Sequence, residues 1–353
     1  MKKFTVFSGF LGSGKTTTMM ALTKYYTEHH GKAAMISNDL GRQSLADNKL
    51  AVLAGCNASE LVGECICYQT ENLVDRLDKL FDQDGCELVI SDIPGFGVGA
   101  LDHVYHTLQK RYTDRYQLAP FTVLVEPRTV ELLRKDQGGD LEYILKTQLV
   151  EADLIVLNKC DLLNAHEKDQ AIAWLAENYG RAQIVAISAL TGAGLEDLSQ
   201  ALSRGAASMH LPDIGYGGPV MGAAMSKISE FYVQYYATVC CNDFDGNAYL
   251  MDLAKAIQTG IREQGCEIPH LKLLAWEPEG DYGKADLLGV DRPVEVTKRF
   301  EKPCTELAVM LNTSAACPSK ELDQIMTSAM ETISEQYNLS LMVYKKECFG
   351  MGG

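Results

Sequence analysis

Short apolar runs alternate with amphipathic stretches from Lys2 to about Gly205. The runs have the length of strands, and the stretches between them carry apolar residues at helical spacing. Strands that are apolar throughout are typical of a parallel sheet that helices cover on both faces. The predicted strands are Phe4–Ser8, Ala33–Ser37, Leu88–Ser91, Thr122–Glu126, Leu154–Leu157 and Ile184–Ile187, and the predicted helices include Thr17–His30, Leu73–Phe81, Thr129–Leu149 and Glu167–Tyr179.

The last third of the chain has a different pattern. A stretch dense in proline and glycine, residues 211–219, interrupts the alternation and is typical of a linker. Beyond it the predicted strands outnumber the predicted helices, which indicates a small α+β domain. These strands are 228–239, 271–276, 294–300, 307–312 and 341–345, and the helices are 248–264 and 319–336.

Together the patterns predict an α/β fold: a P-loop NTPase domain with a mostly parallel sheet covered by helices on both faces, then a smaller α+β domain. The expected boundaries are 1–210 for the first domain, 211–225 for the linker, 226–346 for the α+β domain and 347–353 for a flexible tail. Nothing in the second domain has a catalytic pattern. Cys240, Cys241 and Cys304 are candidate ligands by residue type but are expected to pack in its sheet, and Cys348 is expected to lie on the tail.

Composition and charge narrow the possible partners. The chain has 353 residues, of which 46% are hydrophobic and 22% charged, and its formal net charge is −15. This charge argues against a nucleic-acid partner held by a basic face. No apolar run approaches the ~20 residues that a membrane span needs, and no signal peptide precedes the first motif. Because the eleven cysteines lack the spacing of a small disulfide scaffold, we expect a reduced, cytoplasmic protein.

A glycine-rich loop follows the first predicted strand. Residues 9–16 read Gly-Phe-Leu-Gly-Ser-Gly-Lys-Thr and precede a predicted helix, which is the context of a phosphate-binding loop. The glycines let backbone N–H groups turn towards a phosphate chain, and the positive end of the helix dipole faces the same anion. Lys15 is expected to reach the outer phosphates and Thr16 to hold Mg²⁺. The predicted nucleotide contacts here are Gly9, Gly12, Ser13, Gly14, Lys15, Thr16 and Thr17.

A second motif, Asp92-Ile93-Pro94-Gly95, ends the strand predicted at 88–91. An acid at a strand end can hold Mg²⁺, and a glycine N–H can approach a γ-phosphate because no Cβ intervenes. With Lys15 and Thr16, Asp92 and Gly95 complete the predicted catalytic set. Asp39 follows another strand and is a further magnesium candidate, although a plain loop carboxylate explains it equally well.

Two later motifs predict recognition of the base. The sequence Asn158-Lys159-Cys160-Asp161 follows an apolar strand, and the Asp161 carboxylate can accept two hydrogen bonds from guanine, whereas adenine offers no such pair of donors. Asn158 is expected to brace the loop and the Lys159 stem to cover the base. After the last strand come Ser188 and Ala189, and the Ala189 N–H is expected at the guanine oxygen.

These four motifs, in this order, resemble the CobW/UreG/HypB family of metal-chaperone GTPases, nearest to its CobW-like branch. The segment Glu60–Tyr68 is similar to that branch's metal motif, which normally reads Gly-Cys-Ile-Cys-Cys. Asp92–Gly95 stands where relatives commonly have Glu-Thr-Thr-Gly, and Gln148–Asp161 is similar to the family's base-recognition strand. The resemblance covers residues 1 to about 205.

Cys65 and Cys67 are candidate ligands for a transition metal such as Zn²⁺ or Co²⁺. In an extended segment, residues two apart place their side chains on one face. Tyr68 replaces the family's third cysteine, so further ligands would come from Cys56, from His103 and His106, from a second subunit or from water. The alternative interpretation, that both thiols are small buried apolar groups, remains open.

The resemblance implies GTP binding and hydrolysis with Mg²⁺, coupled to delivery of a metal (cobalt, zinc or nickel) or a corrinoid cofactor to a client enzyme. Slow intrinsic turnover is expected, accelerated by a partner or a homodimer. The client would be a metalloenzyme or a corrinoid protein, with cobalt or a corrinoid as the preferred cargo. Two alternatives are a chaperone that gates cofactor exchange without binding metal, and a non-hydrolysing nucleotide-dependent scaffold.

Overall fold

The computed structural model describes residues 2–42, 46–136, 138, 140–208, 210, 222–223, 225–239, 242–278 and 280–351. These residues form two compact units, Met1–Met221 and Gly222–Gly353. Most of the expected linker, as well as Cys240 and Cys241, lies outside the described residues. No helix in the described ranges combines the length and the apolar character that crossing a bilayer requires.

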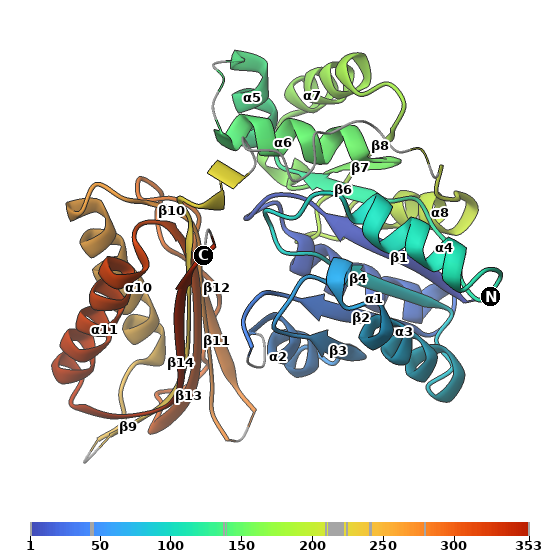
Figure 1. Ribbon diagram of the computed structural model, residues 1–353. Coiled ribbons are helices and arrows are strands. Elements are labelled where there is room, and N and C mark those ends of the chain that lie inside the picture. The colour runs from blue at the N-terminus through green and yellow to red at the C-terminus, as the bar shows by residue number, and fades with distance from the viewer. Residues whose placement is uncertain are drawn as a thin grey trace. The chain divides into compact units, whose positions relative to one another are not determined.

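The first unit is built on one parallel sheet with the strand order β3-β2-β4-β1-β6-β7-β8, and β5 pairs with β1 (Figure 1). The strands are β1 (Lys3–Ser8), β2 (Ala33–Asn38), β3 (Ala58–Leu61), β4 (Leu88–Asp92), β5 (Gln117–Leu118), β6 (Thr122–Val125), β7 (Leu154–Leu157) and β8 (Gln183–Ala186). Every residue of β1, β2, β4, β6 and β7 is buried, as strands covered on both faces require. The predicted fold class is therefore confirmed.

Helices cover both faces of this sheet. They are α1 (Lys15–His29), α2 (Ala46–Leu53), α3 (Thr70–Asp78), α4 (Thr107–Arg111), α5 (Pro127–Lys135), α6 (Asp140–Glu151), α7 (Ala165–Asn178) and α8 (Leu195–Arg204). Short turns also occur: the 3₁₀ turns η1 (Ile66–Tyr68) and η4 (Cys160–Leu162), and the π turns η2 (Lys79–Gln83) and η3 (Leu101–His106). Helices α1 and α8 pack against one face of the sheet through one apolar layer. Helices α3 to α7 pack against the other face through a second apolar layer.

One predicted helix is wrong in extent. The stretch Thr129–Leu149 forms two helices, α5 and α6, instead of one. Asp136 has a φ of 45° and Gly138 a φ of 77°, so the backbone is left-handed at both positions and cannot continue a right-handed helix. The apolar spacing of the two helices concealed this break.

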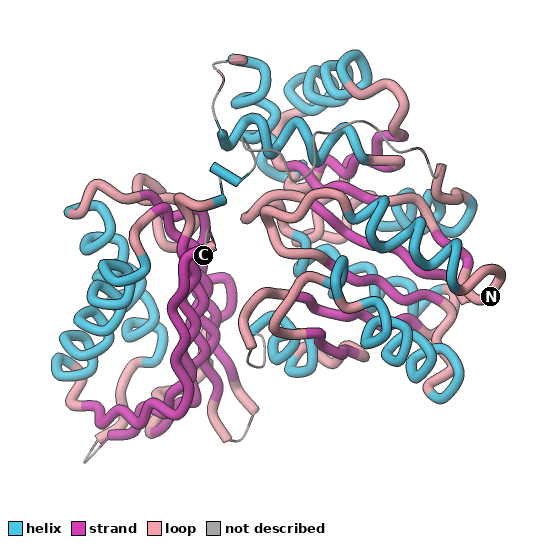
Figure 2. Tube along the Cα trace, viewed as in Figure 1, coloured by secondary structure: helices cyan, strands magenta, loops and turns pink. Residues whose placement is uncertain are grey.

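The second unit is an antiparallel sheet with the order β12-β11-β10-β13-β9-β14 and two helices on one of its faces (Figure 2). Its elements are β9 (Ser229–Val239), α10 (Gly246–Glu263), β10 (Glu267–Trp276), β11 (Tyr282–Leu287), β12 (Glu295–Lys298), β13 (Glu306–Ala316), α11 (Ser319–Gln336) and β14 (Leu339–Gly350). The expected α+β architecture is confirmed, and Cys304 is fully buried in its core as expected. Strand β11 was not predicted from the sequence.

The predicted flexible tail begins too early. Strand β14 continues to Gly350, which pairs with Ser229 of β9, so residues 347–350 belong to the sheet. Cys348 is consequently half-buried opposite Phe231 instead of free. The glycine-rich composition of the last residues concealed a pairing that only the distant strand β9 supplies.

Candidate functional site

The phosphate-binding loop connects β1 to α1, as the sequence predicts. Gly9, Gly12 and Gly14 have φ values of 131°, 80° and 90°, which side chains rarely tolerate. A Cβ on Gly9 would lie 2.4 Å from the Leu124 carbonyl oxygen, and one on Gly14 would lie 2.3 Å from Asn158 Nδ2. The loop therefore has a backbone path that requires glycine, in direct contact with β6 and with the Asn158 motif.

The side chains of this loop fit an anionic ligand. Lys15 Nζ donates to the Gly9 carbonyl at 2.5 Å and the Phe10 carbonyl at 3.4 Å, so the ammonium group lies over the loop. Ser13 Oγ is buried and has no hydrogen-bond partner among the described residues. Thr16 and Thr17 lie in the first turn of α1 and are partly exposed. The left-handed cradle, the cation and the unpartnered hydroxyl suit a nucleoside triphosphate with Mg²⁺.

Neighbouring strand ends bring the magnesium candidate beside this loop. Asp92 ends β4 in register with Phe7 of β1, and its side chain is buried. Asp92 Oδ1 accepts a hydrogen bond of 2.7 Å from the backbone N–H of Asn38, the last residue of β2. Asp39 follows directly, and its Oδ1 accepts from the Leu40 N–H at 2.8 Å, which closes a local turn.

Asn38 connects Asp92 to the cysteine segment, a role that was not predicted from the sequence. Its Nδ2 donates to the carbonyls of Leu61 and Glu64, at 3.0 and 2.8 Å, and its Oδ1 accepts from the Ile66 N–H at 2.9 Å. This buried amide thus fixes the backbone on both sides of Cys65. A continuous set of hydrogen bonds runs from the Asp92 carboxylate to the cysteine segment.

Gly95 is packed against the phosphate-binding loop. A Cβ at this position would lie 2.5 Å from Leu11 Cδ2 and 3.1 Å from the Leu11 backbone nitrogen, so any other residue would force the Leu11 side chain to move. The loop after Gly95 is held by α6: Gln148 Nε2 donates to the Gly95 and Gly97 carbonyls at 3.0 Å each, and Glu151 Oε2 accepts from the Gly99 N–H at 2.9 Å. Burial raises the pKa of Glu151 to about 7.

The sequence did not predict Gln148 or Glu151 as functional residues. Gln148 stood out only as the start of the segment that resembles the family's base-recognition strand. Their partners lie about fifty positions earlier in the chain. A buried Gln and a buried Glu on one helix face are unusual, and this polarity is the signal that could have identified them.

The two motifs that the sequence proposes for base recognition, Asn158–Asp161 and Ser188–Ala189, are in contact. Asn158 Nδ2 donates to the Ser13 carbonyl at 2.9 Å, which braces the phosphate-binding loop, and Asn158 Oδ1 accepts from the Ala189 N–H at 3.1 Å. The Ala189 N–H, expected at the guanine oxygen, therefore has Asn158 as its partner in this structure. Ser188 Oγ donates to Asp161 Oδ1 at 2.5 Å and orients an exposed carboxylate.

Lys159 has the left-handed conformation, with a φ of 61°, and lies between β7 and the turn η4. Its Nζ lies 2.7 Å from Glu126 Oε2. The neighbouring Cys160 N–H donates to the Ile187 carbonyl at 3.0 Å, so this loop is tied to the end of β8. The ion pair holds the lysine stem at the edge of the Asn158–Asp161 motif.

The cysteine segment differs from its predicted extended form. Cys65 is extended, but residues 66–68 form the 3₁₀ turn η1, whose first residues pack in the apolar layer below. This turn places Cys65 Sγ 3.4 Å from the Cys67 backbone nitrogen. The hydrogen bond from the Cys67 thiol lowers the pKa of Cys65, whereas that contact and burial raise the pKa of Cys67 well above its usual value. Of the two thiols, Cys65 therefore loses its proton more readily than Cys67.

The expected additional ligands do not assemble around this pair. Cys56 packs against the apolar layer on the opposite face of the sheet, so it cannot reach Cys65. The His103 ring lies 5.9 Å from the ring of Tyr68, which is 63% exposed. Within the described parts of the chain, neither Cys65 nor Cys67 belongs to a group of three potential ligands. By itself, the cysteine segment therefore offers a metal two sulfur ligands.

A polar cleft of about 500 Å³ lies beside the cysteine segment. Its lining includes side chains of both charges as well as the Tyr68 ring: Arg42, Glu64, Tyr68, Gln69, Glu71 and Arg111. It is therefore suited to a polar or charged group beside Glu64 and Tyr68, which flank the two cysteines in sequence.

Comparisons with curated proteins identify relatives that match about half of the chain. Zinc chaperone YeiR from Escherichia coli K12 is 26% identical over 188 residues, which cover 52% of this chain and 55% of YeiR. Zinc chaperone CobW from Sinorhizobium sp is 26% identical over 187 residues, covering 46% and 51%. The chain therefore spans about half the length of the curated relatives it matches.

Solved structures are similar at lower identity. HypB from Helicobacter pylori in complex with nickel is 18% identical, covers 57% of this chain and 85% of its own, and has a TM-score of 0.42. The Zn(II)-bound YjiA GTPase from E. coli is 17% identical and covers 94% and 98%, with a TM-score of 0.36.

The family of the chain follows from its first unit. Residues 3–186, more than half of the chain, match the sequence model of the CobW/HypB/UreG nucleotide-binding domain. This range contains the phosphate-binding loop, Asp92, the cysteine segment and Asn158 in one connected site. The chain therefore belongs to the CobW/HypB/UreG family through its nucleotide-binding domain.

Proposed function

We propose that this protein is a GTP-hydrolysing metallochaperone in which the state of the nucleotide controls a metal held at Cys65 and Cys67. The observation that carries this proposal is the set of hydrogen bonds from Asp92 through Asn38 to the backbone around Cys65. These hydrogen bonds connect Asp92, the candidate magnesium ligand, to the segment that carries Cys65 and Cys67, and all of these residues lie in the first unit. A change at the phosphates can therefore alter the position of the thiols.

The choice of guanine rests on Asp161. Its carboxylate is exposed at the end of the motif that begins with Asn158, and the Ser188 hydroxyl orients it. A carboxylate there can accept the N1–H and the exocyclic amine of guanine together. Asn158 holds this recognition loop to Ser13, so base binding and phosphate binding use the same brace.

Hydrolysis depends on positioning and on charge. Lys15, now over its own loop, would turn to the β- and γ-phosphates and offset the charge that develops on them. Thr16 and Asp92 would hold Mg²⁺, which supplies further positive charge at the same oxygens when bound. Gly95 would donate its N–H to the γ-phosphate, and loss of that phosphate would release the loop that Gln148 and Glu151 hold. We expect slow turnover that a client protein or a second copy of the chain accelerates.

Zinc is the first candidate for the cargo, since both curated relatives are named as zinc chaperones and thiolates are good zinc ligands. Two sulfur donors leave positions for solvent or for ligands from the client, and such a site can release its metal readily. A cobalt or corrinoid cargo remains a second possibility for the same site. The thiols require reducing conditions such as those of the cytoplasm.

One observation favours a second candidate function. Tyr68 stands in place of the family's third cysteine, and no third ligand approaches the pair within the described residues. The second candidate is a G-protein chaperone that gates cofactor exchange on a client enzyme and binds no metal itself.

Zinc release in a single turnover tests the first proposal. The protein is loaded with zinc and GTP, and a chromophoric chelator records release while phosphate is measured in parallel. We expect release to follow hydrolysis, and both to be lost in Lys15→Ala. Lys24→Ala, a change of an exposed lysine on the same helix, serves as the control. Equal release with and without hydrolysis would contradict the coupling. Zinc binding and release that stay unchanged when Cys65 and Cys67 are replaced by serine would favour the second candidate.

A further inference from the structure

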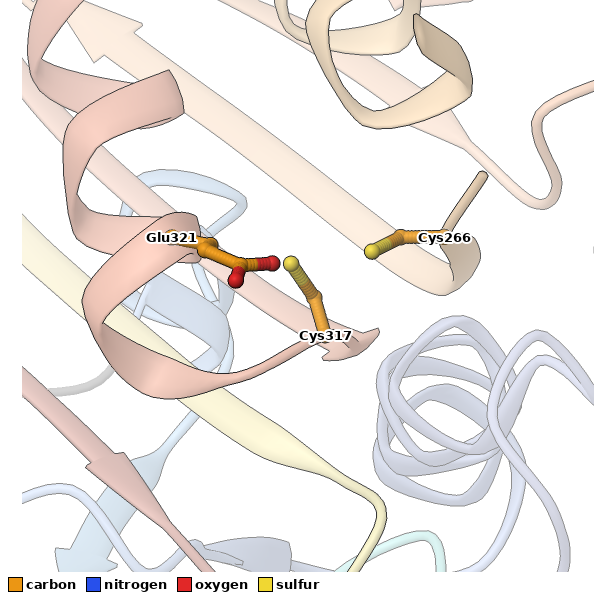
Figure 3. Close-up of side chains that lie close together, drawn as sticks. All are labelled: Cys266, Cys317 and Glu321. Carbon is orange, nitrogen blue, oxygen red and sulfur yellow. The ribbon is translucent and has the colours of Figure 1, made fainter. Parts of the chain in front are cut away.

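Three potential metal ligands converge in the second unit, far from the nucleotide-binding motifs in sequence. Cys266 lies between α10 and β10, Cys317 follows β13, and Glu321 lies in the first turn of α11. The two sulfur atoms and a carboxylate oxygen all lie within 4.8 Å of one another, and the side chains point towards a common space (Figure 3). Within the described residues this is the one group of three or more His, Cys, Asp or Glu ligands at such distances.

The fold brings these residues together by strand pairing. Strands β10 and β13 are antiparallel, and Glu267 pairs with Ala316 at one end of the ladder. Cys266 and Cys317 are the residues next to this pair, so they lie at the same end of the two strands. Helix α11 starts two residues after Cys317 and places Glu321 over the same point.

The surroundings of Cys317 are well fixed. Its carbonyl accepts a hydrogen bond of 2.7 Å from Ser229 Oγ, and the residue is 2% exposed. Cys266 is partly exposed and Glu321 is exposed, so the group is closed on one side and open to solvent on the other. The Cys348 thiol donates to the Ser319 carbonyl at 3.1 Å, at the start of α11.

The donor set indicates the kind of ligand. Two thiolates with one carboxylate suit zinc and other borderline divalent cations, whereas hard cations such as Mg²⁺ and Ca²⁺ prefer oxygen ligands only. Three protein ligands at an open position allow a fourth from solvent and permit exchange of the metal. A disulfide between the two thiols is the competing outcome, and it requires an oxidant.

We propose that Cys266, Cys317 and Glu321 form a zinc-binding site in the C-terminal unit, separate from Cys65 and Cys67 and independent of the nucleotide. Solvent occupies the fourth position. This site goes beyond the proposed function, because it would exist whether or not the first unit delivers metal.

The test counts zinc sites in the full-length, reduced, metal-free protein by competition with a chromophoric chelator. We expect Cys65→Ser with Cys67→Ser to retain one equivalent of zinc that GTP and GDP leave unchanged. Adding Cys266→Ser to that variant should lower the affinity for the remaining zinc at least about tenfold. Even the loss of a residue that only hydrogen-bonds to a metal ligand typically lowers metal affinity by this much. Glu321→Gln should also weaken it. Cys304→Ser, a change of a buried thiol in the same unit, is the matched control and should have no effect.

A cobalt titration gives a second readout, since thiolate ligands produce charge-transfer absorption that Cys266→Ser should reduce. Because Cys266 and Glu321 are not core residues, their variants should fold, and thermal unfolding will check this. Absence of zinc from the Cys65→Ser, Cys67→Ser variant would overturn the proposal. Unchanged zinc affinity in folded Cys266→Ser and Glu321→Gln would also overturn it. The same holds if Cys266 and Cys317 form a disulfide and, once this is reduced, the two thiols still bind no zinc.

Discussion

At the scale of single residues, Asp161 determines which base we expect the site to accept. Replacing it with asparagine keeps an oxygen for the Ser188 hydroxyl but exchanges a charged acceptor for an amide donor. Hydrogen bonds to charged groups contribute about 1.5–3 kcal/mol, so Asp161→Asn should lower the preference for GTP over ATP roughly 10- to 100-fold. Competition titrations of the two nucleotides measure this.

The control for this variant is Asp169→Asn, which changes an exposed carboxylate on α7 and should leave the preference as it is. If Asp161→Asn also left the preference unchanged, the assignment of guanine to this motif would be wrong.

Glu151 gives the site a dependence on pH. Burial raises its pKa to about 7 in the folded protein, whereas an unfolded glutamate has a pKa of about 4.3. The folded state therefore binds more protons between these values, so the stability that Glu151 contributes is present below about pH 4 and is lost as the pH rises through 7. Glu151→Gln has no such proton and should become more stable relative to the wild type across this range, by up to about 4 kcal/mol.

Denaturant unfolding at pH 5, 6, 7 and 8 measures this difference. Glu142→Gln on the same helix provides the comparison, because its carboxylate is paired with Lys146. A constant difference between Glu151→Gln and the wild type at all four pH values would show that Glu151 is ionised throughout.

At the scale of elements, Asn38 connects the end of β2 to the segment that contains Cys65. Asn38→Ala removes three hydrogen bonds and leaves the Leu61 and Glu64 carbonyls and the Ile66 N–H without this partner. Each buried group so affected costs about 1–3 kcal/mol, so stability should fall by a few kcal/mol. GTP should still bind, but the nucleotide should no longer change the affinity for zinc.

The matched control is Asn72→Ala, which removes one hydrogen bond to Gln69 on the exposed surface of α3. Hydrogen exchange over residues 61–68 should increase in Asn38→Ala and not in the control. A folded Asn38→Ala protein with full nucleotide dependence would exclude this residue as the connection.

Much of the first unit could be predicted from local pattern. The strands Phe4–Ser8, Ala33–Ser37 and Leu154–Leu157 are apolar throughout, and burial on both faces explains why their boundaries agree with β1, β2 and β7. The phosphate-binding loop was predictable for a similar reason, since its glycines are required by its own backbone path.

The remaining features depend on contacts between distant segments. The hydrogen bond from Gln148 to the Gly95 carbonyl joins residues 53 positions apart, so no local sequence pattern predicts it. The 3₁₀ turn η1, which begins directly after Cys65, is held by Asn38, which lies 28 positions before Ile66. Cys266 and Cys317 likewise meet only because β10 pairs with β13.

At the scale of the whole molecule, the two units carry different chemistry. The first holds the nucleotide motifs and the Cys65–Cys67 pair, and the second holds Cys266, Cys317 and Glu321. Any measurement of metal binding must therefore separate two groups of thiols. The double variant Cys266→Ser, Cys317→Ser leaves only the first group of thiols able to bind zinc. If this variant does not fold, the double variant Cys266→Ser, Glu321→Gln is used in its place.

The zinc dissociation constant in that background, measured with a non-hydrolysable GTP analogue, with GDP and without nucleotide, tests the central claim most directly. Coupling between two sites typically amounts to 1–3 kcal/mol, so we predict at least about a fivefold difference between the GTP-analogue and GDP states. The difference should disappear when Cys65 and Cys67 are replaced by serine. Equal zinc affinity in all three nucleotide states would contradict the proposed coupling.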